Sequence, residues 1–440
     1  MEMPSPTSRG SPFSRISTRR TIVARSGVYN RDRRRGGRAV PAHRTGRLYA
    51  APGRVVATVV TRAPDAHPDA GGSRAVCRID LAALRHNLAA IRRAIGPGVA
   101  VCGVVKADAY GHGAIPVARA LAAEGIEHLA VASVDEAAEL RHAGIDVPIL
   151  VFGSVRPDRV REAVRLRLAV TVWSAAAARA LADALDPAAP LDVHVKVDTG
   201  MHRIGALAGD LSALADVLRA GPFRIAGTMS HLACADQPGH ASVPAQIEAF
   251  ESALRALSSL GVAPGVRHLA NSAGAVAWPA ARYDMVRPGI ALYGGAPSPQ
   301  LAGRLDLRPV MHLQTRVLQL KTIPAGDRVG YGHTYAATRP TRLAVLPVGY
   351  AIGYPRALSN RADVLIRGHR APVAGTISMD HVTVDVTDVP GAAEGDVVTL
   401  WGSDGTQHLD VMELGARAGT IGYELLTCVS PRTPRIYDDD

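Results

Sequence analysis

The segment VCGVVKADAYGHG, residues 101–113, joins a strand-like run to a loop suited to close ligand contact. Its first five residues are small or β-branched and apolar, as in a strand that is covered on both faces. Lys106 follows at once, and then come Tyr110 and glycines at positions 111 and 113. A lysine after a strand is usually a solvated loop residue. The two glycines favour instead a loop whose backbone approaches a ligand closely.

Seven more strand-like runs accompany this one, separated by alanine-rich helical segments. The eight runs span residues 99–105, 128–133, 147–153, 167–173, 191–197, 223–231, 266–272 and 283–287. Candidate helices lie at 114–125, 133–144 and 244–261, and Ser133 and Glu136 have the spacing of a capping box. Eight alternations of strand and helix predict an α/β fold built on a closed (β/α)₈ TIM-type barrel rather than an open sheet.

The sequence pattern changes after residue 309. Alternating runs such as LQTRVLQLKTI and TRLAVLPVGY are punctuated there by Gly and Pro, which is typical of a mostly β domain. We therefore predict a barrel over residues 74–308, which holds the ligand, and a mostly β C-terminal domain over 309–440. The 440-residue chain, 47% hydrophobic and 20% charged, is long enough to fill both.

The net charge of +11 is concentrated in the first 73 residues. That stretch has fourteen Arg, no Lys and four acidic residues, so it carries +10 and the rest of the chain carries +1. It shows no helical or strand period, and we expect a disordered, Arg-rich extension. A solvated tail or over-long translated start, a transit peptide and a nucleic-acid arm all remain open. The near-neutral body predicts no nucleic-acid partner.

Membrane and metal roles have no support in the sequence. Each apolar run is interrupted before the roughly 18 residues that a spanning helix needs. Four cysteines, Cys77, Cys102, Cys234 and Cys428, are widely spaced, and neither CxxC nor HExxH occurs. We expect no metal site, and a reducing cytoplasmic location fits free cysteines.

Reactive groups in such a barrel stand at the carboxyl ends of the strands. Lys106 ends the first run, Ser272 ends the seventh, and Arg287, Gly289 and Ile290 end the eighth. The loops after strands seven and eight often hold a phosphate through backbone N–H groups and a hydroxyl. A lysine opposite a phosphate cradle predicts pyridoxal 5'-phosphate bound as a Schiff base.

Nine motifs then identify a family. VVKADAYGHG, KVDTGMHRIG, MSHLACAD, ANSAG, MVRPGIALYG, VGYGHTY, PVGYAIGYPR, AGTISMDH and TIGYEL stand in the order found in alanine racemases, and the resemblance covers about residues 74–440. It implies a cytoplasmic, homodimeric isomerase with shared active sites. Such an enzyme interconverts L- and D-alanine with pyridoxal phosphate and supplies D-alanine for peptidoglycan.

The resemblance also implies residue roles. Lys106 carries the cofactor and is one catalytic base, while Tyr331 of the partner subunit is the other. A tyrosine needs a positive neighbourhood to act as a base, because its ordinary pKa is roughly 10. The remaining cofactor-binding positions are Tyr110, Arg203, His231, Ser272, Arg287, Gly289, Ile290 and Tyr423, and the substrate-binding positions are Arg203, Met379 and Asp380.

Arg287 matches the arginine that faces the pyridine nitrogen, with His231 to orient it. A permanent cation there disfavours protonation of the ring and so favours racemisation over competing reactions. Arg203 resembles the arginine that contacts the phenolic oxygen. Lys196 resembles a lysine that is carbamylated in many members, which would turn a repelled ammonium into a partner for Arg203. An unmodified Lys196 remains open.

Two positions depart from the family pattern, and both bear on the substrate corridor, whose matched residues are Tyr350, Asp236 and Arg356. Ile352 stands where the family usually has Asp, and Thr376 stands where some members have Arg. Two alternatives stay open: a serine or broader amino-acid preference, and a non-catalytic pyridoxal-phosphate-binding protein. A basic amino-acid decarboxylase is the nearest rival enzyme, but that family sets an acid against the pyridine nitrogen, where this chain has Arg287.

Overall fold

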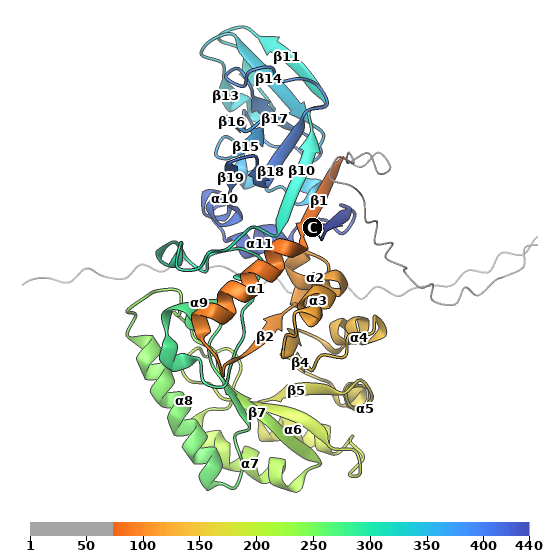
Figure 1. Cartoon of the computed structure of the whole chain (residues 1–440), viewed down its shortest axis with the longest axis vertical. Coiled ribbons are helices and arrows are strands. Elements are labelled where there is room, and N and C mark those ends of the chain that lie inside the picture. Colours follow the sequence, from red (N-terminus) through yellow and green to blue (C-terminus); the bar gives the residue numbers. More distant parts are fainter. Residues whose placement is uncertain (1–73, 440) are drawn as a thin grey trace, which may run out of the picture. The chain divides into compact units, whose positions relative to one another are not determined.

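The computed structural model describes residues 74–439, and its first large region is built on an eight-stranded parallel sheet, of which Figure 1 labels β2, β4, β5 and β7. The strands are β2 (Ala100–Val104), β3 (His128–Val131), β4 (Ile149–Val151), β5 (Leu168–Val172), β6 (Leu191–Lys196), β7 (Phe223–Met229), β8 (Val266–His268) and β9 (Met285–Val286). They pair in the order β8-β7-β6-β5-β4-β3-β2-β9. All eight lie within the runs that the sequence predicts.

The two end strands of this sheet approach each other and nearly close the ring. Asn271 and Arg287, which follow β8 and β9, form a parallel bridge. The Arg287 N–H donates to the carbonyl of Ala270 at 2.9 Å. The predicted barrel is therefore confirmed, and the carboxyl ends of its strands meet at one mouth.

Helices alternate with the strands along the chain. They are α2 (Lys106–Gly111), α3 (Ala114–Ala123), α4 (Val134–His142), α5 (Val160–Arg165), α6 (Ala175–Ala182), α7 (Leu211–Ala220), α8 (Ser242–Ser259) and α9 (Ser272–Ala277). Ser133 caps α4 by accepting from the Glu136 N–H at 3.2 Å. The reciprocal half of the predicted capping box does not form, because the Glu136 carboxylate accepts from Ala132 and Ala107 instead.

The second region is mostly β, as predicted. Its strands are β10 (Met311–Arg316), β11 (Gln319–Ile323), β12 (Arg328–Val329), β13 (Tyr335–Ala336), β14 (Thr341–Leu346), β15 (Asp363–Ile366), β16 (His369–Pro372), β17 (Val382–Asp385), β18 (Val397–Asp404), β19 (Gln407–Leu409) and β20 (Arg435–Asp438). Two short helices, α10 (Val411–Ala418) and α11 (Gly422–Thr427), precede β20. The largest sheet has the order β16-β15-β18-β10-β1-β20, with β19 on β18.

One strand of that sheet comes from the other end of the described chain. β1 (Ala75–Asp80) pairs antiparallel with β10 and parallel with β20, and Figure 1 shows it beside β10. Residues 75–80 were expected in the barrel, but their apolar residues are buried in the β sheet instead. Asp80 ends β1 and caps α1 (Leu81–Ile95) by accepting from the Ala83 N–H at 2.7 Å. The boundary at residue 308 stays a prediction.

The barrel and the β region share one hydrophobic core, which includes Val104 and Tyr110 from the barrel and Leu426 from α11. The two regions meet beside the loop after Lys106, where the Arg435 Nε donates to the Gly111 carbonyl at 3.2 Å. A Cβ on Gly111 would lie 2.3 Å from the Leu426 carbonyl oxygen. The β region thus supports the loop that carries Lys106.

Four expectations concern the N-terminal extension, membrane spans, metal sites and cysteines. The first 73 residues lie outside the described part of the chain. Within residues 74–439, no helix is long and apolar enough to cross a bilayer, and no group of three or more His, Cys, Asp or Glu could hold a metal ion. All four cysteines are free thiols, with Cys77 and Cys102 buried and Cys428 exposed.

Candidate active site at the barrel mouth

Lys106 stands at the carboxyl end of β2, where the barrel opens, and its side chain is half-buried. Burial lowers the pKa of its ammonium below the usual range, and the positive charge of Arg203 lowers it further. The carboxylate of Glu136 acts in the opposite direction. Lys106 is therefore more often neutral than a solvated lysine, and a neutral amine is the nucleophile that imine formation requires.

The four residues after Lys106 form a left-handed helical turn. Ala107, Asp108, Ala109 and Tyr110 all have φ between 52° and 55°. This conformation costs roughly 1–2 kcal/mol for each L-residue with a Cβ. Strain of this kind persists only where surrounding contacts hold it, and it concentrates at functional sites. The sequence predicted a close backbone approach here but not this turn.

Hydrogen bonds from three side chains hold the strained turn. Glu136 accepts from the Ala107 N–H at 2.8 Å, and Asp108 accepts from the Ala114 N–H at 2.7 Å. The Nδ1 of His112 lies 2.9 Å from the Ala109 carbonyl and 3.0 Å from the Tyr110 carbonyl. Because both partners are acceptors, Nδ1 carries the proton. These contacts explain how the turn persists despite its cost.

A hydroxyl and backbone cradle lies at the ends of β8 and β9. The Ser272 hydroxyl accepts from the Gly289 N–H at 2.9 Å and from the Ala291 N–H at 3.3 Å. A Cβ on Gly289 would lie only 2.3 Å from the Tyr110 hydroxyl oxygen. The structure therefore brings Ser272, Gly289, Ile290 and Tyr110 together. Small size at position 289 admits the tyrosine hydroxyl to the backbone of this loop.

Aromatic rings fix Tyr110 in place. Its ring centroid lies 4.8 Å from that of Tyr293 and 6.1 Å from that of Tyr423. Tyr293 is buried, donates to the Val104 carbonyl at 2.9 Å and stacks on His112 with centroids 4.5 Å apart. Sequence analysis did not single out Tyr293 or His112. An aromatic in IALYG and a histidine between two glycines were the available signals.

Arg287 is buried beneath the mouth, and its guanidinium is anchored by four neighbours. Nη2 donates to the carbonyls of Ser230 at 2.6 Å and Leu269 at 3.0 Å. Nη2 also lies 3.4 Å from the His231 Nδ1, and Nη1 lies 2.8 Å from the His268 Nδ1. Burial lowers the pKa of Arg287 to about 10, so it keeps its charge at neutral pH. Its orientation is thus set by the barrel wall.

The contact with His268 extends into a second histidine that the sequence analysis missed. Because Arg287 donates to the His268 Nδ1, the proton of a neutral His268 sits on Nε2. Nε2 lies 2.7 Å from the His194 Nδ1, which accepts that proton's hydrogen bond. Burial depresses the pKa of both rings, to about 3 for His194 and well below the usual value for His268. Polar residues inside apolar strands were the only signal for them.

Lys196 and Arg203 lie near Lys106. Lys196, at the end of β6, is 7% exposed, and burial followed by the charge of Arg203 lowers its pKa to about 8. Arg203 is exposed in the loop after β6. His231 follows β7, and burial together with the charge of Arg287 lowers its pKa to about 3. The charge of Arg203 therefore lowers the pKa of both Lys106 and Lys196, which places the three side chains near one another.

The other predicted site residues lie in the β region. Tyr331 is 73% exposed and Met379 is 54% exposed. The Tyr350 N–H donates to the carbonyl of Ser378, the residue before Met379, at 3.2 Å. Asp380 forms an ion pair with Arg74 at 2.9 Å. Among the described residues, no hydrogen bond or ion pair joins Tyr331 or Met379 to the group around Lys106. The hydrogen bonds and ion pairs of the described residues therefore do not link the two predicted bases within one chain.

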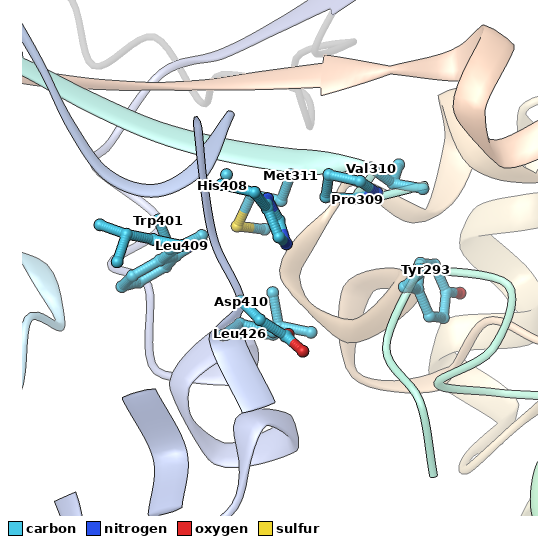
Figure 2. Close-up of a pocket in the computed structure, with 12 residues that line it drawn as sticks. Tyr293, Pro309, Val310, Met311, Trp401, His408, Leu409, Asp410 and Leu426 are labelled. Carbon is cyan, nitrogen blue, oxygen red and sulfur yellow. The ribbon is translucent and has the colours of Figure 1, made fainter. Parts of the chain in front are cut away.

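Of the corridor residues, Asp236 lies near Tyr110 and Tyr423. The pKa of Tyr423 is raised first by burial, then by Tyr110 and then by the charge of Asp236. Arg356 is exposed and Ile352 partly buried, and both lie in the β region. A small pocket, partly open to solvent, lies on the side of Tyr293 that faces the β region (Figure 2). Its lining includes Tyr293, Trp401 and His408 but none of the predicted site residues. The barrel mouth therefore remains the candidate site.

Comparison with known proteins gives the family. A model of the alanine racemase N-terminal domain matches residues 79–297, and a model of the C-terminal domain matches residues 310–437. Together they span most of the chain, with the barrel motifs in one and the β region in the other. The chain belongs to the alanine racemase family. Members of this family depend on pyridoxal phosphate.

Individual members of the alanine racemase family match over nearly their whole length. Alanine racemase of Syntrophobacter fumaroxidans is 46% identical over 349 residues, which cover 79% of this chain and 93% of that protein. The protein of Desulfovibrio desulfuricans is 43% identical over 365 residues, or 82% and 96%.

Solved alanine racemase structures agree with the fold. The structure from Streptomyces coelicolor is 41% identical, covers 83% of this chain and 98% of its own, and has a TM-score of 0.78. That from Bacillus anthracis, with bound L-Ala-P, is 33% identical with a TM-score of 0.78, covering 83% and 95%.

Proposed function

We propose that this protein interconverts L- and D-alanine with pyridoxal phosphate bound through Lys106, and that Lys106 and Tyr331 act as its two bases. One observation carries the proposal: a half-buried lysine with a lowered pKa shares the barrel mouth with the hydroxyl and backbone cradle at Ser272 and Gly289. Family membership supports the same reaction, and the product would feed peptidoglycan synthesis.

The residues at the mouth fit the cofactor. Ser272, the Gly289 backbone and the Tyr110 hydroxyl would hold its phosphate, because the Ser272 hydroxyl bonds the Gly289 N–H and the Tyr110 hydroxyl lies against Gly289. Tyr423, 6.1 Å from the Tyr110 ring, borders the same place. Its aldehyde requires a neutral amine, which Lys106 offers. When bound, pyridoxal phosphate withdraws electrons from the Cα of the amino acid and so acidifies the Cα hydrogen.

Arg287 then controls the pyridine end. A buried, permanently charged guanidinium held by two carbonyls and His268 cannot accept a proton from the ring or lend it one readily. Facing the pyridine nitrogen of a bound cofactor, it would disfavour protonation of that nitrogen and so weaken electron withdrawal. An acid at this position, as in the basic amino-acid decarboxylases, would do the opposite. Arg287 therefore favours racemisation over loss of carbon dioxide.

Two bases on opposite faces of the substrate exchange its Cα hydrogen. Lys106 serves one face, and the neighbouring charge of Arg203 keeps its amine able to accept a proton. Tyr331 serves the other from a second copy of the chain in a homodimer, which its 73% exposure in the single chain would allow. Met379 and Asp380 would enter the site with it, and Arg203 would bind the substrate from the barrel side.

The experiment uses the low lysine content of the chain, which contains only Lys106, Lys196 and Lys321. The protein incubated with pyridoxal phosphate and reduced with borohydride should carry the adduct on Lys106, located by peptide mass spectrometry. Lys106→Ala should lose the visible absorption and the conversion of L- to D-alanine. Lys321→Ala, a change on the exposed face of β11, should retain both. An adduct on Lys196 or Lys321 in the wild-type protein contradicts the assignment.

A further inference from the structure

The segment that carries Tyr331 has a backbone with unusual freedom. Gly330 and Gly332 flank the tyrosine with φ of +72° and +71°, and His333 has φ of +51°. Glycines lose more conformational entropy on ordering than other residues, so such a segment needs contacts to hold one conformation. The Tyr331 side chain is 73% exposed and supplies little packing of its own.

A chain of three side chains reaches this segment. The Thr376 hydroxyl donates to the Tyr331 carbonyl at 2.8 Å. Thr376 and Thr334 have hydroxyl oxygens 3.1 Å apart, and the Asn360 Nδ2 donates to the Thr334 hydroxyl at 3.0 Å. The four residues are separated by up to 45 positions in sequence, so only the fold brings them together.

The directions of these hydrogen bonds follow from counting protons. A threonine hydroxyl has one proton to donate. Thr376 gives its proton to the Tyr331 carbonyl, so it can only accept from Thr334. Thr334 has then given its own proton and can only accept from Asn360, as it does. Each bond polarises the next in the same direction, which strengthens the series.

Asn360 anchors the far end of the series. Its Oδ1 accepts from the Gly375 N–H at 2.6 Å, next to Thr376 in sequence. Its own φ of +56° is a conformation that asparagine tolerates better than most residues. Asn360 at one end of the series and Thr376 at the other are thus both held by one loop, residues 375–376. This loop fixes the position of the Tyr331 carbonyl.

We propose that Thr376 is a positioning residue for Tyr331, holding the Tyr331 backbone through the Asn360–Thr334–Thr376 series so that the phenol meets the substrate in one place. The inference rests on the proposed function of Tyr331 as a base. It assigns Thr376 a role in proton transfer rather than in the substrate corridor, because its only proton is committed to the Tyr331 carbonyl.

The test compares Thr376→Val, which removes the hydroxyl at nearly constant volume, with Thr376→Ser, which restores it. Thr341→Val is the matched control, because the Thr341 hydroxyl also donates to a backbone carbonyl, that of Arg339 at 2.8 Å, in the same β region. Each holoenzyme is assayed with L- and D-alanine that carry hydrogen or deuterium at Cα. Thr376→Val should lower kcat/KM about fivefold, and Thr376→Ser should recover most of it.

The isotope effects identify which base is affected. Slowing only the Tyr331 step raises the deuterium effect for the enantiomer whose Cα hydrogen Tyr331 removes. It lowers the effect for the other enantiomer, because the Lys106 step then limits the rate less. A smaller folded fraction moves neither effect, and a corridor defect lowers both. Opposite shifts in Thr376→Val, absent in Thr341→Val, support the proposal, and parallel or absent shifts overturn it.

Two further readouts separate this proposal from the one on which it rests. Amide hydrogen exchange of residues 330–334 without cofactor should accelerate in Thr376→Val and return to the wild-type rate in Thr376→Ser. An unchanged exchange rate counts against the positioning role. Tyr331→Phe tests the base itself: if it keeps full activity, the proposed function of Tyr331 fails. If it is inactive while Thr376→Val behaves as wild type, only the positioning role fails.

Discussion

Replacing Gly289 with alanine should weaken the binding of pyridoxal phosphate by a steric effect alone. The backbone at this position is not in the left-handed region, so alanine fits it without strain. The added Cβ, however, would lie 2.3 Å from the Tyr110 hydroxyl oxygen, where ordinary contact begins at 3.4 Å. Tyr110 must therefore retreat by about 1.1 Å, and its hydroxyl leaves the cradle.

The size of the effect follows from what Tyr110 loses. The ring is buried against Tyr293 at 4.8 Å, so it cannot swing to a new position that keeps the phosphate contact. A hydrogen bond to a charged group contributes about 1.5–3 kcal/mol. Since each 1.4 kcal/mol is a factor of ten, the Kd for pyridoxal phosphate should rise by roughly 10- to 100-fold.

The assay is a titration of the apoprotein with cofactor, followed by the visible absorption of the lysine adduct. Gly209→Ala is the matched control, because a Cβ at Gly209 meets nothing within 4 Å and its φ is also outside the left-handed region. Pyridoxal without phosphate should bind Gly289→Ala and the wild-type protein alike. A Kd for pyridoxal phosphate within about threefold of wild type, or equal losses for both ligands, would refute the cradle.

Three other outcomes are expected. Lys106→Ala and Tyr331→Ala homodimers should each be inactive. Refolding them together should restore about a quarter of wild-type activity, because half the dimers are then heterodimers with one complete site of two. Heterodimers that are verified by native mass spectrometry and are inactive would exclude a site shared between subunits. Arg203→Gln removes a charge that lowers the pKa of Lys106, so the pH at which the apoprotein takes up the cofactor should move upward, and a downward shift contradicts this electrostatic coupling. Burial lowers the pKa of His112 to about 4, below an unfolded value near 6.5, so the unfolded state binds the extra proton and stability is lost as pH falls through that window. The slope should approach 1.4 kcal/mol per pH unit from this residue, and His112→Phe should flatten urea unfolding data between these pH values by that amount.

Most of the architecture was accessible from local pattern. Parallel strands that are buried on both faces have short apolar sequences, and eight such segments alternating with helices are compatible with few folds. The carboxyl ends of those strands then indicated Lys106, Ser272 and Arg287 before any contact was known. β1 escaped this reasoning, since a strand's partner depends on which sheet edge is free, and no local pattern in residues 75–80 records that.

The amino-acid sequence by itself determined the barrel and predicted a lysine and a phosphate site at its strand ends, because periodicity and strand ends are properties of neighbouring residues. Only the tertiary structure decided how those groups are held. The left-handed turn after Lys106, the His194–His268–Arg287 contacts and the Thr376 bond to Tyr331 join residues from different elements. Their energies depend on packing and on which donors and acceptors remain once the backbone is paired, and neither is written in any short stretch of sequence.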